Sequence, residues 1–140
     1  MVTNVFGCNS LIKKRLPLFL SRVRSGFPSP ADDYIEKKLD LNEHLIDHPS
    51  ATFFVKVKGD SMINAGIFSG DMLIVDRSKE ATNNKIIVAV VNGEFTVKRL
   101  RKHFDKVTLM PENPNYRPIE ITDTTDFEVW GVVVHVIHSV

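Results

Sequence analysis

The chain has 140 residues, 43% of them hydrophobic and 25% charged, which suits one compact globular domain of ordinary size. Its formal net charge of +1 indicates no particular class of partner for the chain as a whole. No stretch approaches the roughly 18 apolar residues of a membrane span, and the single cysteine, Cys8, excludes an internal disulfide, so the sequence predicts a soluble cytoplasmic protein without a membrane partner.

Residues 1–25 form a basic arm, with five Lys and Arg and no acidic residue, so the remaining residues carry four net negative charges. A basic arm can contact a nucleic acid or an acidic partner. It can equally be a solvated, flexible tail, and charge alone leaves both interpretations open.

A glycine and two prolines follow within six residues, in Ser25-Gly26-Phe27-Pro28-Ser29-Pro30. Proline denies the backbone a donor and biases the preceding residue toward extended geometry. We therefore expect an exposed, extended connector over residues 26–39 that proteases can reach. Residues 40–140 are predicted to form the folded domain.

A short helix is predicted at about residues 40–47. Asp40 is a good N-cap residue, and Glu43 stands at the capping-box position three residues later. Two leucines share one helical face, and Pro49 ends the run.

From residue 52 the apolar pattern changes to a period of two, which is typical of β-strands. Asn92-Gly93 lies between two such runs and indicates a two-residue hairpin, because a type I′ turn needs positive φ at both positions. Short strands with turn signals between them predict a mostly β fold: a compact antiparallel sheet or barrel-like body with one short helix and the flexible arm. The strands are expected at about 53–58, 72–75, 85–91, 94–100, 107–110, 118–121 and 127–137.

The histidines and the lone cysteine make no metal-binding pattern. His135 and His138 lie three residues apart on a predicted strand, so they face opposite sides. His44 and His48 lie four apart on a helix that Pro49 ends, with no third ligand near them in the sequence. A Gly-rich phosphate loop and an RNA-binding aromatic signature are also missing from the sequence. We therefore expect no metal and no cofactor.

Ser61 lies in Lys58-Gly59-Asp60-Ser61-Met62-Ile63, where a predicted strand ends, and it can be a turn residue or a nucleophile. A serine nucleophile needs a base, and an uncharged lysine can serve. Lowering a lysine pKa from about 10.4 to about 7 costs roughly 4–5 kcal/mol, and burial against apolar surface can cause such a shift. Lys98, on a predicted hairpin strand, is the candidate base, although most strand lysines are solvated. The residues alone leave both interpretations open.

Three motifs, in order along the chain, resemble the LexA/UmuD family of self-cleaving serine–lysine proteins. They are Gly59-Asp60-Ser61-Met62, Gly70-Asp71-Met72-Leu73-Ile74-Val75-Asp76 and Asn92-Gly93-Glu94-Phe95-Thr96-Val97-Lys98-Arg99-Leu100. Phe27-Pro28-Ser29-Pro30-Ala31 and Gly131-Val132-Val133-Val134-His135-Val136 are similar to the UmuD branch of that family. The resemblance covers residues from about 16 to 138 and implies a fold like that of the LexA C-terminal domain.

The resemblance implies that Ser61 is the nucleophile and Lys98 the neutral general base of a serine endopeptidase that acts on itself. The scissile bond would be Ser25–Gly26, in the predicted connector. The Met62 N–H, at the start of a short helical turn, is the expected donor to the oxyanion. The family usually has cysteine or alanine before the scissile glycine, and serine is small enough for the same tight pocket.

The resemblance also implies a role in SOS mutagenesis. A RecA filament on single-stranded DNA would promote self-cleavage, and the trimmed product would join a Y-family polymerase subunit similar to UmuC. The complex would perform translesion synthesis of the polymerase V type. An apolar C-terminal strand suggests a homodimer, and direct sequence-specific DNA binding is not expected. Cleavage within one chain and cleavage between chains both stay open.

Other functions of the same fold fit the sequence less well. A repressor needs a DNA-binding domain before the connector, where this sequence has 25 residues, and a signal peptidase needs a membrane anchor. The alternative from a different class is a non-catalytic regulatory module that binds a polymerase or RecA. In such a module Ser61 would be only a turn residue.

Overall fold

The computed structural model describes residues 2–7, 15–19 and 35–140. Two compact units make up the chain: Met1–Cys8 with Ser50–Val140 form the first, and Asn9–Pro49 form the second. Among the described residues, no helix is both long enough and apolar enough to cross a bilayer.

The second unit contains a two-stranded ladder and a short helix. β2 (Arg15–Phe19) pairs antiparallel with β3 (Ile35–Asp40), and α1 (Leu41–Leu45) follows β3 directly. Asp40 caps the helix, because its side chain accepts a hydrogen bond of 2.9 Å from the Asn42 N–H. The short helix predicted at about 40–47 is therefore confirmed.

The predicted arm and connector are described only in part. Cys8 and the Gly/Pro-rich stretch 25–30, with the expected scissile pair Ser25 and Gly26, lie outside the described residues. The end of the predicted connector, residues 35–39, belongs to β3. Strand β2 was not foreseen because Pro17 interrupts its apolar run, and proline is uncommon inside a strand.

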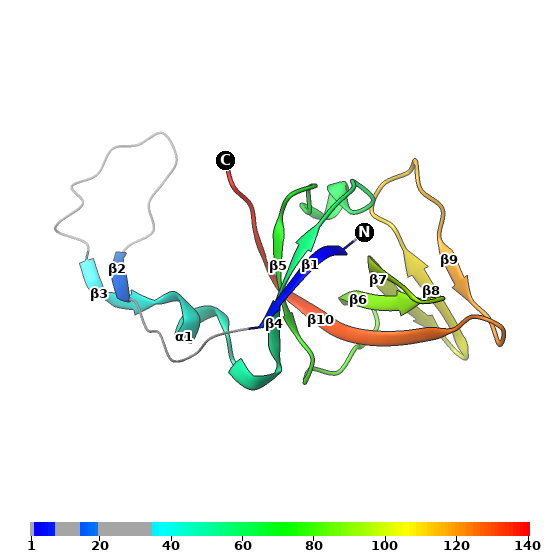
Figure 1. Cartoon of the computed structure of the whole chain (residues 1–140), viewed down its shortest axis with the longest axis horizontal. Helices are drawn as coiled ribbons and strands as arrows, with labels where there is room; N and C mark the ends of the chain where they lie inside the picture. Colours follow the sequence, from blue (N-terminus) through cyan, green and yellow to red (C-terminus); the bar gives the residue numbers. More distant parts are fainter. Residues whose placement is uncertain (1, 8–14, 20–34) are drawn as a thin grey trace. The chain divides into compact units, whose positions relative to one another are not determined.

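An antiparallel sheet of eight strands forms the first unit (Figure 1), which confirms the mostly β prediction. The strand order is β1-β4-β5-β10-β6-β7-β8-β9, so β1 and β9 are its edges. Seven of these strands correspond to the seven predicted ones, and β1 is the additional strand. Their bounds are β1 (Val2–Gly7), β4 (Thr52–Val57), β5 (Met72–Asp76), β6 (Ile86–Val91), β7 (Glu94–His103), β8 (Lys106–Met110), β9 (Ile119–Ile121) and β10 (Phe127–Ile137).

The β6–β7 connection is the two-residue hairpin that the sequence predicts. Asn92 has φ +48° and Gly93 has φ +83°, the positive values that a type I′ turn requires. The Asn92 side chain also accepts a hydrogen bond of 3.0 Å from the Asp126 N–H, which ties the turn to the start of β10. The turn sets the register that pairs Lys98 of β7 with Ile87 of β6.

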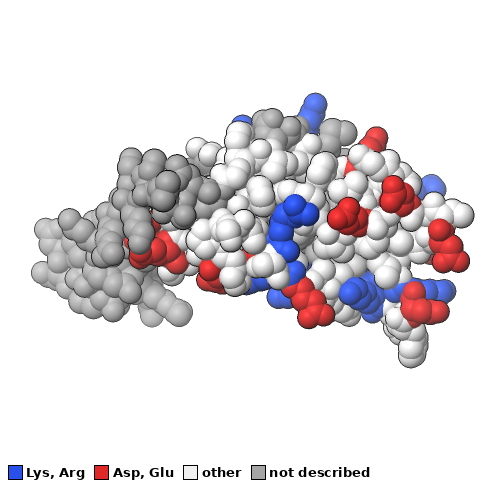
Figure 2. All heavy atoms as spheres, turned by 60° about the horizontal axis from the view of Figure 1, so that its bottom comes forward, with Lys and Arg blue, Asp and Glu red and all other residues white. Residues whose placement is uncertain are grey.

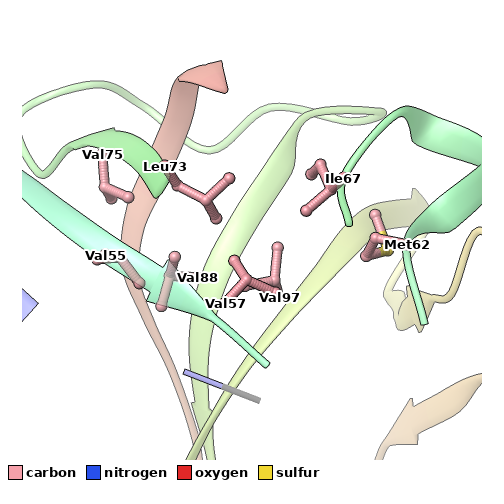
Figure 3. Packing of buried hydrophobic residues seen from close by; sticks show 8 residues of the cluster. All are labelled: Val55, Val57, Met62, Ile67, Leu73, Val75, Val88 and Val97. Carbon is pink, nitrogen blue, oxygen red and sulfur yellow. The ribbon is translucent and has the colours of Figure 1, made fainter. Parts of the chain in front are cut away.

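Two clusters of buried apolar side chains form the core of the first unit. The cluster in Figure 3 combines strand residues with two residues of the segment between β4 and β5, Met62 and Ile67. Their side chains extend toward Val57 and Val97 (Figure 3), and both are almost fully buried. The second cluster gathers Ile87, Ala89, Leu100, Leu109 and Val132. The segment that carries Ser61 is therefore anchored in the core by its own apolar neighbours.

Trp130 on β10 lies in an aromatic group on the sheet. Its ring centroid is 5.3 Å from that of Phe53 on β4 and 5.7 Å from that of Phe95 on β7. The Arg77 guanidinium lies 4.7 Å from the Trp130 ring, and its Nε donates to the Trp130 carbonyl at 2.8 Å. This group joins three strands whose residues are far apart in the sequence.

Charged side chains of both signs are mixed on the surface. On the face that Figure 2 draws, the blue Lys and Arg groups and the red Asp and Glu groups alternate, and neither sign forms a continuous field. On that face, no large area of one charge sign is present that could steer an oppositely charged partner.

Candidate active site

Ser61 lies at the turn between β4 and the 3₁₀ helix η3 (Ile63–Ala65). Gly59 makes this turn possible with φ +100°, a value that side-chain-bearing residues rarely adopt. The next residue, Met62, is only 2% exposed, and its burial holds the turn against the core. The local sequence therefore presents the Ser61 hydroxyl from a fixed corner of the backbone.

The loop between β8 and β9 forms hydrogen bonds with the turn that carries Ser61. The Glu112 N–H donates to the Ser61 carbonyl at 2.8 Å, and the Asn64 N–H donates to the Glu112 carbonyl at 2.8 Å. Asn113 Nδ2 donates to the Asp60 carbonyl at 2.9 Å. Glu112 in turn forms an ion pair with Arg99 of β7. The strand that carries Lys98 and the turn that carries Ser61 are thus tied together through one loop.

Tyr116 adds a further bond to this loop. Its hydroxyl donates to the Asp60 carboxylate, and this hydrogen bond with the nearby negative charge raises the pKa of Tyr116. A hollow of about 300 Å³ lies beside the loop. Asn64 and Glu112 line it together with prolines and Tyr116, but Ser61 and Lys98 do not.

The structure brings Lys98 to Ser61. Lys98 lies in the middle of β7 and is only 7% exposed, and its Nζ is 3.0 Å from Ser61 Oγ. The amine also lies 2.9 Å from Thr96 Oγ1 and 3.1 Å from the Val97 carbonyl. The two residues that the family resemblance assigns to the reaction are therefore within hydrogen-bond distance.

Burial of the Lys98 amine disfavours its charged form. Burial lowers the pKa of Lys98 from its usual value of 10.5, because desolvation penalises the ammonium ion. Its three hydrogen-bond partners are all uncharged. Within the described part of the chain, no carboxylate forms an ion pair with it. The lowered pKa of Lys98 is therefore not offset by an ion pair with any described residue.

The three partners can accept the three N–H bonds of the ammonium form, and a neutral amine can also be fitted to them. A neutral amine has two N–H donors and one lone pair. The Val97 carbonyl and Thr96 hydroxyl can accept the two N–H bonds. The lone pair would then face Ser61 Oγ and accept from its O–H, whereas in the ammonium form Lys98 Nζ donates to Ser61 Oγ. Only the neutral form of the amine could take a proton from Ser61.

The backbone beside Ser61 offers donors to a developing negative charge. Neither the Ser61 N–H nor the Met62 N–H has a hydrogen-bond acceptor among the residues described in the structure. Free N–H groups next to a nucleophile can stabilise an oxyanion. The Met62 N–H, the expected donor, is thus not occupied by another acceptor among the described residues.

Several residues at the site were not identified from the sequence. Thr96 could have been found, because it lies two residues before Lys98 and so shares its face of the strand. Glu112 and Asn113 gave no signal, since their contacts with the Ser61 turn join segments about 50 residues apart. Among the described residues, no three His, Cys, Asp or Glu side chains are grouped so as to hold a metal ion.

Known proteins resemble this chain over most of its length. A family described as Peptidase S24-like matches residues 17–134. Protein ImpA of Escherichia coli is 45% identical over 126 residues, which cover 87% of this chain and 83% of ImpA. Protein SamA of Salmonella typhimurium is 42% identical over 128 residues, covering 91% of this chain and 89% of SamA. The LexA repressor of Bordetella parapertussis is 39% identical over 124 residues, covering 89% of this chain and 56% of the repressor.

Proposed function

The chain belongs to the Peptidase S24-like family, and from this premise we propose that it is a serine endopeptidase that cleaves its own Ser25–Gly26 bond. The match to a LexA repressor, with those to ImpA and SamA, confirms the resemblance to the LexA/UmuD family. The observation that carries the proposal is the 3.0 Å approach of the buried Lys98 amine to Ser61 Oγ.

In the first half of the proposed reaction, Ser61 Oγ attacks the carbonyl carbon of Ser25. Lys98 Nζ takes the serine proton, and the carbonyl oxygen becomes an oxyanion that the Met62 N–H stabilises. The intermediate collapses with cleavage of the C–N bond, and the Lys98 ammonium protonates the departing Gly26 amine. Ser25 is then esterified to Ser61.

In the second half, water hydrolyses the ester. Lys98, again neutral, takes a proton from the attacking water and returns it to Ser61 Oγ, which restores the starting state. No aspartate is needed beside the base, because a lysine has no tautomer to fix. Since the substrate is part of the same molecule or of its dimer, its effective concentration is high, and this helps a simple pair of groups to act.

We place the cleaved product in SOS mutagenesis. In this proposal a RecA filament on single-stranded DNA favours the state in which the connector is docked, without contributing catalytic groups. The product, as a homodimer, joins a Y-family polymerase subunit similar to UmuC for translesion synthesis. Family membership supports this role, while the buried lysine favours a catalytic chain over the alternative, a non-catalytic module that binds a polymerase or RecA.

Incubating the purified full chain at alkaline pH tests the catalytic proposal. Mass spectrometry should find a new N-terminus at Gly26, since deprotonation of Lys98 activates Ser61. Ser61→Ala and Lys98→Ala should each lower the cleavage rate by about 100- to 10,000-fold, the usual contribution of general-base or nucleophilic groups.

Lys102→Ala is the matched control for Lys98→Ala. Lys102 lies on the same strand but is exposed, so this variant should cleave at the wild-type rate. Cleavage of the Ser61→Ala and Lys98→Ala chains at the wild-type rate would identify a contaminating protease, and the proposal would then be wrong. Adding a RecA filament with single-stranded DNA tests the regulatory part separately.

A further inference from the structure

Strand β1 precedes the proposed cleavage site in the sequence. It nevertheless pairs within the sheet whose other strands all follow that site. Its residues pair with 53–57 of β4, from Gly7 opposite Phe53 to Val2 opposite Val57. β4 pairs with β5 along its other side. Cleavage after Ser25 therefore removes the covalent link to an edge strand without breaking its ladder.

A second ladder also connects the two sides of the proposed cut. β2 precedes Ser25 and β3 follows Gly26, and the two strands pair antiparallel from Arg15 opposite Asp40 to Phe19 opposite Ile35. The arm of residues 1–25 thus forms two separate ladders with the part of the chain that follows the cut. Two linked contacts hold a segment far more tightly than either contact alone.

Among the β1 side chains that the structure describes, one is an apolar anchor and the others are exposed. Val2 is partly buried against the core cluster that contains Val55, Val57 and Met62. Val5 and Phe6 are 42% and 49% exposed, so they add little burial. Of the described side chains of β1, Val2 therefore contributes the apolar contact that adds to the backbone hydrogen bonds with β4.

We propose that the outer edge of β4 is a peptide-binding site for the chain's own arm. Before cleavage the arm occupies this site permanently, and after cleavage the arm still binds there but can exchange with other peptides. The inference rests on the proposed cleavage at Ser25–Gly26. Before the cut, the tether holds β1 at a high effective concentration and excludes other strands. After the cut, dilution releases the arm and uncovers the edge of β4 that pairs with β1, while the pairing of β4 with β5 stays in place. Such an edge accepts an extended peptide by β-strand addition.

The site can be tested without relying on self-cleavage. The recognition sequence of a site-specific protease is inserted after Ser25 in the full chain carrying Ser61→Ala, and that protease makes the cut. Size-exclusion chromatography of the concentrated cut protein should recover the arm together with the rest of the chain. A fluorescent peptide of residues 1–25 should enter the cut chain at least about 100-fold more readily than the uncut chain.

Two valine variants of the fluorescent peptide distinguish specific strand pairing from nonspecific binding. Val2→Asn should weaken its binding about tenfold or more, because it removes the apolar anchor. Val5→Asn, the matched control at an exposed position, should bind within about twofold of the unchanged peptide. Hydrogen exchange should show faster amide exchange in β4 after the arm is diluted away, and unchanged exchange in β6, which is paired on both sides.

Three results would overturn the proposal. They are immediate separation of the cut arm from concentrated protein, equal peptide entry into cut and uncut chains, and equal effects of the two valine variants. If the alkaline incubation of the wild-type chain gives no Gly26 terminus while the protease-cut chain exchanges the peptide, the self-cleavage proposal fails and the binding site stands.

Discussion

Lys98 and Lys102 are the same residue type, four positions apart on β7 and directed to the same face of the strand, yet their surroundings differ completely. The Lys98 amine is buried among a hydroxyl, a carbonyl and the Ser61 side chain. Lys102 is exposed, and its amine donates to the Ala81 carbonyl at 3.0 Å. Leu100, fully buried between them, marks where the strand leaves the core.

The difference shows that burial, and not residue type or strand position, lowers the pKa of Lys98. A solvated ammonium holds its proton at neutral pH, whereas desolvation destabilises the charged form. The Ser61 turn contributes to that desolvation, because Met62 and Ile67 pack it against the core beside β7. Three predictions sharpen this comparison.

The largest effect is expected from replacing each lysine by arginine. Lys98→Arg should lower the self-cleavage rate by about 100- to 10,000-fold, because a guanidinium does not release its proton and cannot serve as a base. Lys102→Arg keeps an exposed cation and should cleave within about twofold of the wild type. Timed gels of both variants at one alkaline pH measure the ratio, and a Lys98→Arg chain as active as Lys102→Arg would remove the distinction between the two sites.

The pH dependence of cleavage gives the second prediction. The rate should rise about tenfold per pH unit while Lys98 is mostly protonated, and should level off above its folded-state pKa. Because burial lowers the pKa of Lys98, the plateau should begin below the usual lysine value of 10.5. Rates of Gly26 N-terminus formation across a series of buffers give the profile.

Lys102→Ala provides the control for this profile. It should reproduce the wild-type curve, since the buried amine is unchanged. A rate that does not vary with pH, or that levels off only above 10.5, would exclude Lys98 as the titrating base. Circular dichroism at each pH verifies that the chain stays folded.

The smallest effect concerns stability. With the pKa of Lys98 lowered in the folded state, the unfolded chain binds more protons between the folded and unfolded pKa values, so stability rises with pH across that window. Lys98→Met removes the loss of stability that protonation of the unfolded chain causes. This variant should therefore raise the melting temperature near neutral pH by a few degrees, equivalent to about 1 kcal/mol. The gain should shrink toward pH 10. In contrast, Lys102→Met should keep the rise of stability with pH seen in the wild type.

Much of the fold was predictable because its signals are local. Alternating apolar residues placed seven strands, Asn92-Gly93 placed a turn, and Asp40 placed the start of the helix. The pairing of Ser61 with Lys98 was different. Local chemistry left it open, and only the order of several motifs nominated it before the 3.0 Å contact was seen.

The rest was not predictable because it depends on pairing between distant segments. Val2–Gly7 contains β-forming residues but lacks the alternation of apolar and polar residues seen in the predicted strands, and its partner in the sheet is the edge of β4. Likewise, Glu112 and Asn113 look like ordinary loop residues until the fold places their loop against the Ser61 turn. The predicted scissile pair, Ser25 and Gly26, lies outside the described residues, so its position relative to Ser61 stays a prediction.

The aromatic group on the sheet gives the molecule an optical reporter. Trp130 is the chain's single tryptophan, and its ring contacts Phe53, the residue whose backbone pairs with Gly7 of β1. Loss of β1 would uncover the backbone edge at Phe53, and the indole in contact with that ring is placed to sense the change. Intrinsic fluorescence could then follow departure of the N-terminal strand in real time, without any attached dye.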